Sequence, residues 1–388
     1  MRRPVALLLS ATSLGMAQAS VPASPASGPS TSTFNLNCPP AVAQASAPTD
    51  SSPSAPATVH GQPLTAGTPS TVHCPPSTDR AALPANPIVS HLFTADPAAR
   101  VFGDRLYVYT SHDEADSTYF DMFDWRLFST ADLATWQDHG SVFGLKDFAW
   151  AEKWAWAPDA VQANGNYYLF LPTDRARIGV AIGDSPTGPF RDALGSPLLD
   201  KALQPEVGPE PIDPAVLLDD DGSAYLYFGC RFAKVVKLAP SLTALAGPVQ
   251  DITLLDPQGN PVPVAAPEKQ PALPMGYGEA PFLFKREGRY YFVYSNGWAK
   301  ESTLVYATGS SPTGPFTYQG EVMKHVPCVT HHGSVVAFRG KWYVVYHTSE
   351  LSGGNMFRRA ICIDELTFDS AGRIVPVVAT PASTSRLR

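Results

Sequence analysis

Short runs of aromatic and β-branched residues dominate the chain from about residue 86 onward. Leu106–Tyr109, Tyr167–Phe170 and Trp342–Tyr346 are typical of these runs, and Gly, Asn or Asp residues lie beside them. Apolar runs bounded by turn-forming residues predict β-strands, and the apolar spacing typical of amphipathic helices is nearly absent. The pattern therefore predicts an all-β domain whose strand signals continue to Val378.

The strand runs recur in five copies, each opened by small or polar residues at a near-constant offset. The copies begin at residues 96, 157, 213, 279 and 332. Later segments repeat as well, since Gly179–Phe190 and Leu304–Phe316 both end in Ser-Pro-Thr-Gly-Pro-Phe. We interpret these two segments as third strands with their turns. Five copies in a fixed phase predict a five-bladed β-propeller, because a sandwich would not explain the phase.

The N-terminal part of the chain has a different composition. Residues 1–19 combine two arginines, an apolar run and the small-residue end Ala17-Gln18-Ala19, which predicts a signal peptide and a secreted or periplasmic protein. Residues 20–85 are rich in Ser, Pro and Ala with almost no aromatic residues, so we expect a disordered linker. The propeller is then expected over 86–380.

Charge and cysteine content limit the classes of molecule and metal that the protein is expected to bind. A formal net charge of -7 gives no electrostatic reason to bind nucleic acid or an anionic membrane, and a neutral substrate fits better. The five cysteines show no metal-binding spacing. Cys38 and Cys74 could pair after export, whereas Cys230, Cys328 and Cys362 are expected to be plain buried side chains.

Four chemically active residues share one phase of the repeat. The first strand of every propeller blade lines the central channel, so Asp96, Asp213, Glu279 and His332 should converge there. An Asp before Pro commonly opens a turn, but three carboxylates and an imidazole together favour catalysis. Glycoside hydrolysis needs a protonated and an ionised carboxyl, roughly 6.5 to 9.5 Å apart when configuration is inverted. Opposite sides of a propeller axis offer that separation.

The ordered set of motifs resembles glycoside hydrolase family 43 over essentially the whole domain. The motifs, one set per blade, are Thr94–Pro97 with Ser111–Asp113, Trp154–Asp159, Ile212–Pro214, Gly278–Pro281 and His331–Ser334. The resemblance implies that Asp96 is the general base, Glu279 the general acid, and Asp213 the carboxylate that orients the acid and raises its pKa. A neighbouring negative charge keeps a carboxylic acid protonated near neutral pH, which agrees with these roles.

The same resemblance implies a set of substrate-binding residues. An arginine of the last blade matches Arg359, with Arg358 as the competing choice because strand alternation points the two in opposite directions. Trp156 would stack on the sugar beside Ile212, and His112 and Asp113 would add polar contacts. Blade packing accounts for most of the seven tryptophans. The further sugar platforms that we keep open are Trp150, Trp154 and Trp298.

The resemblance also bears on metal binding. It implies that no cofactor is required, and that His332 could hold a water or a structural calcium ion in the central channel, mostly through waters. Calcium prefers several oxygen ligands, and the sequence contains no acidic loop of that kind.

Several functions remain open at this point. The resemblance favours release of β-D-xylosyl or α-L-arabinofuranosyl residues from plant hemicellulose or derived oligosaccharides, and loops over 114–125 and 265–277 favour exo action. An endo-arabinanase would differ mainly in loops. A retaining fructan hydrolase is less compatible, because its Asn-Asp-Pro and Glu-Cys motifs are absent. A non-catalytic glycan-binding propeller would not require three carboxylates in phase.

Overall fold

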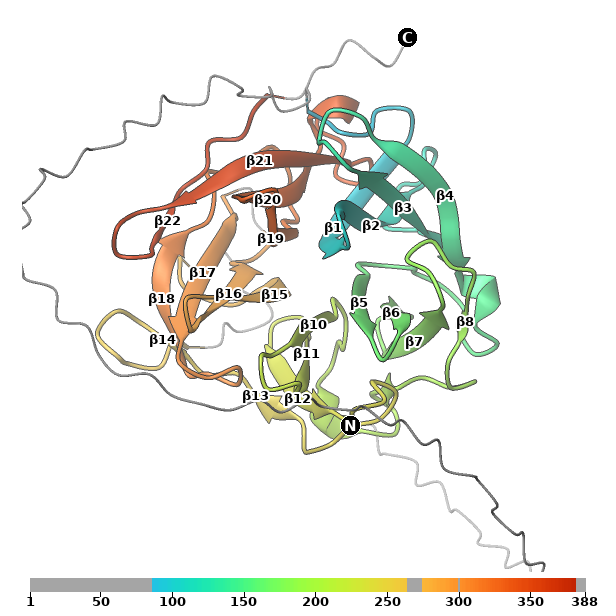
Figure 1. Ribbon diagram of the computed structural model, residues 1–388, viewed down its shortest axis with the longest axis horizontal. Helices are drawn as coiled ribbons and strands as arrows, with labels where there is room; N and C mark the ends of the chain where they lie inside the picture. Colours follow the sequence, from blue (N-terminus) through green and yellow to red (C-terminus); the bar gives the residue numbers. More distant parts are fainter. Residues whose placement is uncertain (1–85, 264–273, 299–300, 382–388) are drawn as a thin grey trace, which may run out of the picture. The chain divides into compact units, whose positions relative to one another are not determined.

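Five β-sheets arranged in a ring form the folded part of the protein (Figure 1). The computed structural model describes residues 86–263, 274–298 and 301–381. These residues contain no α-helix, only three short 3-10 turns. The expected all-β five-bladed propeller is thereby confirmed. The expected signal peptide, linker and Cys38–Cys74 pair lie outside the described residues.

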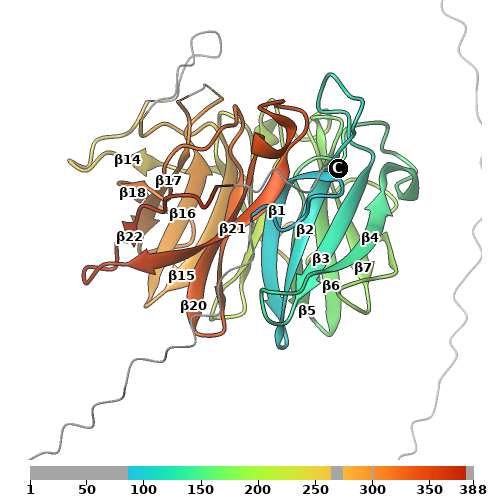
Figure 2. The same ribbon diagram turned by 90° about the horizontal axis from the view of Figure 1, so that it is seen from above.

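Each blade is a sheet whose strands follow one another outward from the axis (Figure 1), and Figure 2 shows the same sheets after a turn of 90°. The first blade holds β1 (Phe93–Phe102), β2 (Arg105–Asp113), β3 (Asp124–Thr130) and β4 (Gln137–Gly144). The second holds β5 (Asp159–Ala163), β6 (Asn166–Thr173), β7 (Arg177–Gly183) and β8 (Phe190–Asp192), with β9 (Leu199–Asp200) pairing with β7. The third holds β10 (Ala215–Leu218), β11 (Ala224–Phe228), β12 (Lys234–Leu238) and β13 (Gln250–Asp251).

The last two blades follow the same plan. The fourth holds β15 (Glu279–Arg286), β16 (Arg289–Ser295), β17 (Leu304–Gly309) and β18 (Phe316–Glu321), and β14 (Leu254–Leu255) pairs in parallel with β18. The fifth holds β19 (Gly333–Phe338), β20 (Lys341–Thr348), β21 (Ala360–Phe368) and β22 (Ile374–Val375). Each first strand contacts the first strand of the next blade, so β1, β5, β10, β15 and β19 surround the channel.

The innermost hairpins of three blades use the same turn chemistry. Asn164–Gly165, Glu287–Gly288 and Arg339–Gly340 connect the first and second strands of blades two, four and five, and both residues of each pair have positive φ. Two residues of positive φ make the tight turn whose twist matches that of the paired strands. Glycine meets this demand at the second position without steric cost.

The repeated Ser-Pro-Thr-Gly-Pro-Phe segment joins neighbouring blades. As the sequence predicts, it forms the turns after third strands β7 and β17. The buried hydroxyl of Tyr109 in blade one donates to the carbonyl of Pro186 in blade two at 2.6 Å. Tyr227 of blade three donates equivalently to Pro312 of blade four at 2.7 Å. Each tyrosine therefore packs its ring inside one blade and satisfies a turn carbonyl of the next.

The ring closes between the first and last blades. The buried side chain of Asn86 accepts from the Ile363 amide at 2.9 Å and donates to the Ile363 carbonyl at 3.2 Å. Thr94 of β1 donates its amide to the Arg359 carbonyl at 2.9 Å. The segment before β1 thus pairs with β21, which joins the two ends of the repeat array.

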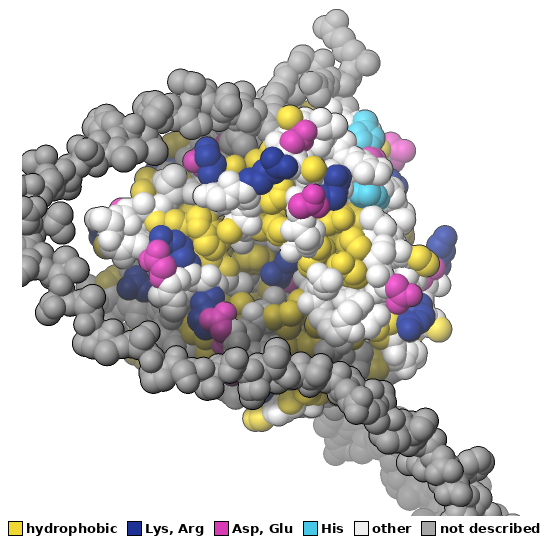
Figure 3. All heavy atoms as spheres, in the orientation of Figure 1, with side chains coloured by type: hydrophobic (Ala, Val, Ile, Leu, Met, Phe, Trp, Pro, Cys, Tyr) yellow, Lys and Arg dark blue, Asp and Glu magenta, His cyan; other side chains and the backbone are white. Residues whose placement is uncertain are grey.

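Hydrophobic, charged and cysteine side chains take distinct places in the folded domain. On the face seen in Figure 3, hydrophobic side chains gather over the middle of the ring, and pairs of opposite charges lie further out. Cys230, Cys328 and Cys362 are buried free thiols, as the sequence predicts. Within the described residues, no helix has the length and apolar character needed to cross a membrane.

Candidate active site

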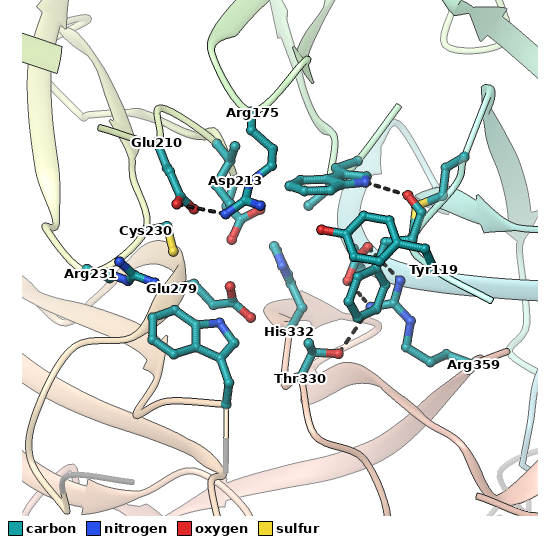
Figure 4. Close-up of a pocket in the computed structure, with 17 residues that line it drawn as sticks. Tyr119, Arg175, Glu210, Asp213, Cys230, Arg231, Glu279, Thr330, His332 and Arg359 are labelled. Atoms are coloured by element: carbon teal, nitrogen blue, oxygen red, sulfur yellow. Dashed lines mark hydrogen bonds and ion pairs between the residues drawn. The ribbon is translucent and has the colours of Figure 1, made fainter. Parts of the chain in front are cut away.

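A pocket of about 250 Å³ lies at one end of the central channel. Figure 4 shows its side chains converging from all five blades. The sequence-predicted residues that line it are Asp96, Trp156, Ile212, Asp213, Glu279, His332 and Arg359. Residues far apart in the chain therefore meet, as the shared repeat phase predicts.

Backbone bulges aim the first-strand carboxylates at the pocket. In β1 the pairing register shifts between Ala95 and Ala98, and Asp96 adopts a left-handed conformation with φ of 53°. In β15 the shift lies between Glu279 and Phe282, and the left-handed residue is Ala280. Glu279 is therefore one residue earlier relative to its bulge than Asp96, in agreement with Glu279-Ala280-Pro281 against Asp96-Pro97 in the sequence. Bulges of this kind commonly redirect side chains beside active sites.

Asp96 is a buried carboxylate held by a dense set of donors. Arg359 donates to Oδ1 at 2.9 Å, and Ser111 donates to Oδ2 at 2.6 Å. Burial opposes ionisation, but the charges of Arg359 and of the neighbouring histidines and the Ser111 bond outweigh it and lower the Asp96 pKa to about 2. Asp96 is thus ionised at any pH near neutrality.

The partly buried Glu279 and the buried Asp213 form a carboxyl pair on the other side of the pocket from Arg359 (Figure 4). Burial and the negative charge on Asp96 raise the pKa of Glu279, a hydrogen bond from the Trp298 indole opposes the shift, and the resulting pKa is about 7. Burial and the adjacent Glu279 raise the Asp213 pKa as well, although its Oδ2 accepts the Ala280 amide at 3.0 Å. Two adjacent carboxyls shielded from water cannot both ionise easily, so the pair retains a proton near neutral pH.

Arg359 is the pocket-facing arginine of the last blade. Its guanidinium donates to both oxygens of Asp113, at 2.8 and 2.9 Å, as well as to Asp96. Arg359 is 2% exposed and lines the pocket, whereas Arg358 does not line it. The structure thus selects Arg359 over its neighbour.

Asp113 and His112 are placed differently from the sequence-based expectation, because neither lines the pocket. Both carboxylate oxygens of Asp113 accept hydrogen bonds from the Arg359 guanidinium. His112 points the opposite way along β2 and its Nδ1 pairs with Asp124 at 2.8 Å. Strand alternation sends the two side chains to opposite faces of the sheet, and neither face opens into the cavity.

Aromatic side chains form one wall of the pocket. Trp156 lines it and is fixed by donation from its indole N–H to the Phe120 carbonyl at 2.8 Å. Tyr119 and Phe120 also line it, and both come from the loop between β2 and β3. Of the further tryptophans, Trp298 lines the pocket, whereas Trp150 and Trp154 do not.

The wall nearest Glu279 contains polar residues that sequence reasoning missed. Arg175 and Glu210 form an ion pair at 2.7 Å, Arg231 lies over the Trp298 ring at 5.6 Å, and Cys230 lies beside them. Arg175 and Glu210 lie in connections between strands, outside the repeating strand signals. The repeat phase that revealed the carboxylates therefore carries no signal for them.

His332 lines the pocket and is buried, and burial lowers its pKa. The carboxylates that act on it are Asp96 and Asp159, each already bound by an arginine. Because both of these carboxylates are occupied by arginines, neither is free to ligate a calcium ion beside His332. The hydrated ion stays a prediction. Elsewhere, ligand atoms of His112, Glu114 and Asp124 lie within 4.8 Å of one another.

Comparison with known proteins agrees with this geometry. A xylosidase/arabinosidase from Humicola insolens is 36% identical over 337 residues, which cover 74% of this chain and 98% of that protein. A xylosidase/arabinosidase from Bacteroides ovatus is 34% identical and is covered to 95%. The crystal structure of a β-xylosidase/α-arabinofuranosidase from a compost metagenome, calcium-free and in complex with xylotriose, has a TM-score of 0.68 at 36% identity. The structural match covers 76% of this chain and 97% of the chain in that crystal structure.

The match to a protein family spans the whole propeller. The sequence model described as glycosyl hydrolases family 43 matches residues 84–374. These residues include all five blades up to the first residue of β22, and they include Asp96, Asp213 and Glu279. With relatives above 30% identity covered almost completely, the chain belongs to glycosyl hydrolase family 43.

Proposed function

We propose that the protein is an inverting, exo-acting glycosidase that releases β-D-xylosyl or α-L-arabinofuranosyl residues from hemicellulose-derived oligosaccharides. The observation that carries the proposal is the contrast between two carboxyls in one pocket. The Asp96 pKa is lowered to about 2, whereas that of Glu279 is raised to about 7. A base that is always ionised and an acid that is protonated near neutrality are the pair that glycoside hydrolysis requires.

In this mechanism the sugar lies between the two carboxyls. Asp96 accepts a proton from water as the water oxygen attacks the anomeric carbon. Glu279 donates its proton to the glycosidic oxygen as the bond to the leaving group breaks. Arg359 keeps Asp96 ionised and oriented, and Asp213 keeps a proton available on the carboxyl pair. One bond forms and one breaks on opposite faces, so the product anomer is inverted.

The substrate class rests on the pocket and on the relatives. The pocket is small, lined by Trp156 and other aromatic residues on one wall and by polar side chains on the other, which suits one end of a neutral oligosaccharide. The Humicola insolens and Bacteroides ovatus relatives are named xylosidase/arabinosidases, and a GH43_1 enzyme from Xanthomonas citri has been solved with xylose at 36% identity and a TM-score of 0.69. The expected export of the chain is consistent with a polymeric plant substrate.

Proton NMR of the first product tests the stereochemistry. The enzyme is incubated with xylobiose and with an α-L-arabinofuranoside, and the anomeric signals are followed before mutarotation. We expect the inverted anomer to appear first on at least one of them. Early appearance of the retained anomer, or a glycosyl ester on Asp96, would overturn the mechanism. No turnover of a panel of nitrophenyl glycosides and xylo-oligosaccharides would contradict the proposed activity itself.

A further inference from the structure

A histidine that does not line the pocket contacts Asp96 from behind. His347 lies in β20, and its side chain is fully buried. The Asp96 amide donates to Nδ1 of His347 at 3.0 Å. On the far side of the ring, Nε2 lies 2.9 Å from the carbonyl oxygen of Thr330. The ring is therefore held between two backbone groups from different parts of the chain.

These two partners fix the tautomer of the imidazole. A backbone amide can only donate, so its bond at 3.0 Å places the lone pair on Nδ1, and the Asp96 Oδ1 atom lies further from this nitrogen, at 3.4 Å. A backbone carbonyl can only accept, so Nε2 must carry the proton. The ring is consequently neutral, and burial together with the Arg359 charge lowers the His347 pKa to about 3, which keeps it neutral under working conditions.

The backbone of Asp96 needs such a contact. Its φ of 53° is uncommon for a residue with a side chain, and its carbonyl is followed by Pro97. A left-handed residue with a side chain is strained and persists only where its surroundings hold it. Ala280 in β15 has the same conformation before Pro281, and its amide is held by Asp213 Oδ2. In the first blade the histidine takes the place of that carboxylate.

We propose that His347 is a positioning residue that holds the backbone of Asp96, through a neutral imidazole of fixed tautomer, so that its carboxylate faces the attacking water. The inference rests on the proposed role of Asp96 as the base. Thr330 completes the arrangement, because its carbonyl orients the imidazole while its hydroxyl accepts from Arg359 at 3.2 Å. The backbone and the carboxylate of Asp96 are thus held by two side chains that meet at one threonine.

Two variants separate the two ends of the ring. His347→Asn places an acceptor near the position of Nδ1, whereas His347→Gln places its amide near the position of Nε2 and leaves the Asp96 amide without a partner. Misplacement of a reacting group by about 1 Å costs roughly 10²-fold in rate. We expect kcat on xylobiose to fall roughly 10²-fold in the Gln variant and less than about 10-fold in the Asn variant, with KM changed less than kcat.

The pH profile provides a readout that loss of packing alone would not move. If Asp96 turns away from Arg359, its pKa rises from about 2 toward 3.8, so the acidic limb of kcat/KM moves to higher pH in the Gln variant than in the Asn variant, which loses the same imidazole. Equal losses of kcat in both variants with acidic limbs at the same pH would overturn the inference. So would unchanged kcat in the Gln variant while Asp96→Asn is inactive. Activity retained in Asp96→Asn would instead refute the proposed base.

A measurement on the wild-type protein covers the case in which neither variant folds. Nitrogen-15 NMR of histidine-labelled protein distinguishes protonated from unprotonated ring nitrogens. We expect His347 to show a protonated Nε2 and an unprotonated Nδ1 from pH 5 to pH 8. A protonated Nδ1 anywhere in this range would contradict the inference, because the Asp96 amide would then have no acceptor.

Discussion

Replacing Asp96 with asparagine tests the site most directly. The amide has nearly the shape of the carboxylate but cannot take a proton from water. General-base catalysis contributes roughly 10²–10⁴-fold, so kcat on xylobiose should fall by about that factor. The fold should persist, because the Asn side chain can still accept from Arg359 or Ser111, and the guanidinium keeps both bonds to Asp113.

The stability cost follows from the lowered pKa. A pKa reduced from 3.8 to about 2 corresponds to about 2 kcal/mol of stabilisation of the ionised form. This stabilisation is present above pH 3.8, the ordinary pKa of the unfolded chain, and is lost as pH falls through about 2. We expect urea denaturation at pH 7 to show a free energy of unfolding lower by about 2 kcal/mol in the variant. Near pH 3 the difference should be smaller.

Asp364 provides the matched control. It is 4% exposed and accepts from Tyr346 at 2.7 Å, but it does not line the pocket. Asp364→Asn should lower stability and leave kcat close to that of the wild type, which separates catalytic loss from destabilisation. Wild-type turnover by folded Asp96→Asn would refute the reasoning. A similar kcat loss in both variants would show that the assay follows stability instead of the base.

Three further outcomes are expected. Wild-type kcat/KM should decline as pH rises through about 7, because Glu279 must be protonated to act as the acid. Trp298→Phe should move this alkaline limb to higher pH because it removes a bond that lowers the Glu279 pKa, whereas Glu210→Gln should move it lower because it removes a charge that raises that pKa. A shift of the same sign in both would contradict the assignment. Deleting residues 20–85 should leave Tm unchanged, and a deletion that also removes Asn86 should lower it, because the Asn86 bonds to Ile363 are lost.

Repetition in the sequence determined the architecture and the main chemistry of the site. Hydrophobic runs and turn residues are local signals, and five copies in one phase can close only as a ring whose first strands face inward. Asp96, Asp213 and Glu279 could therefore be brought together before any coordinates. Arg359 required the family resemblance in addition, because a cation at the start of a strand has no distinctive pattern of its own.

Tertiary structure alone decided the details that tune the site. Arg175 and Glu210 meet through connections between strands, and His347 reaches Asp96 across 251 positions of sequence. The bulges beside Asp96 and Glu279 depend on how each strand pairs with its neighbour. A repeat specifies which strand a residue occupies. The direction of a side chain and the pKa of its acid depend on burial and on charges from other blades, and these exist only once the ring has closed.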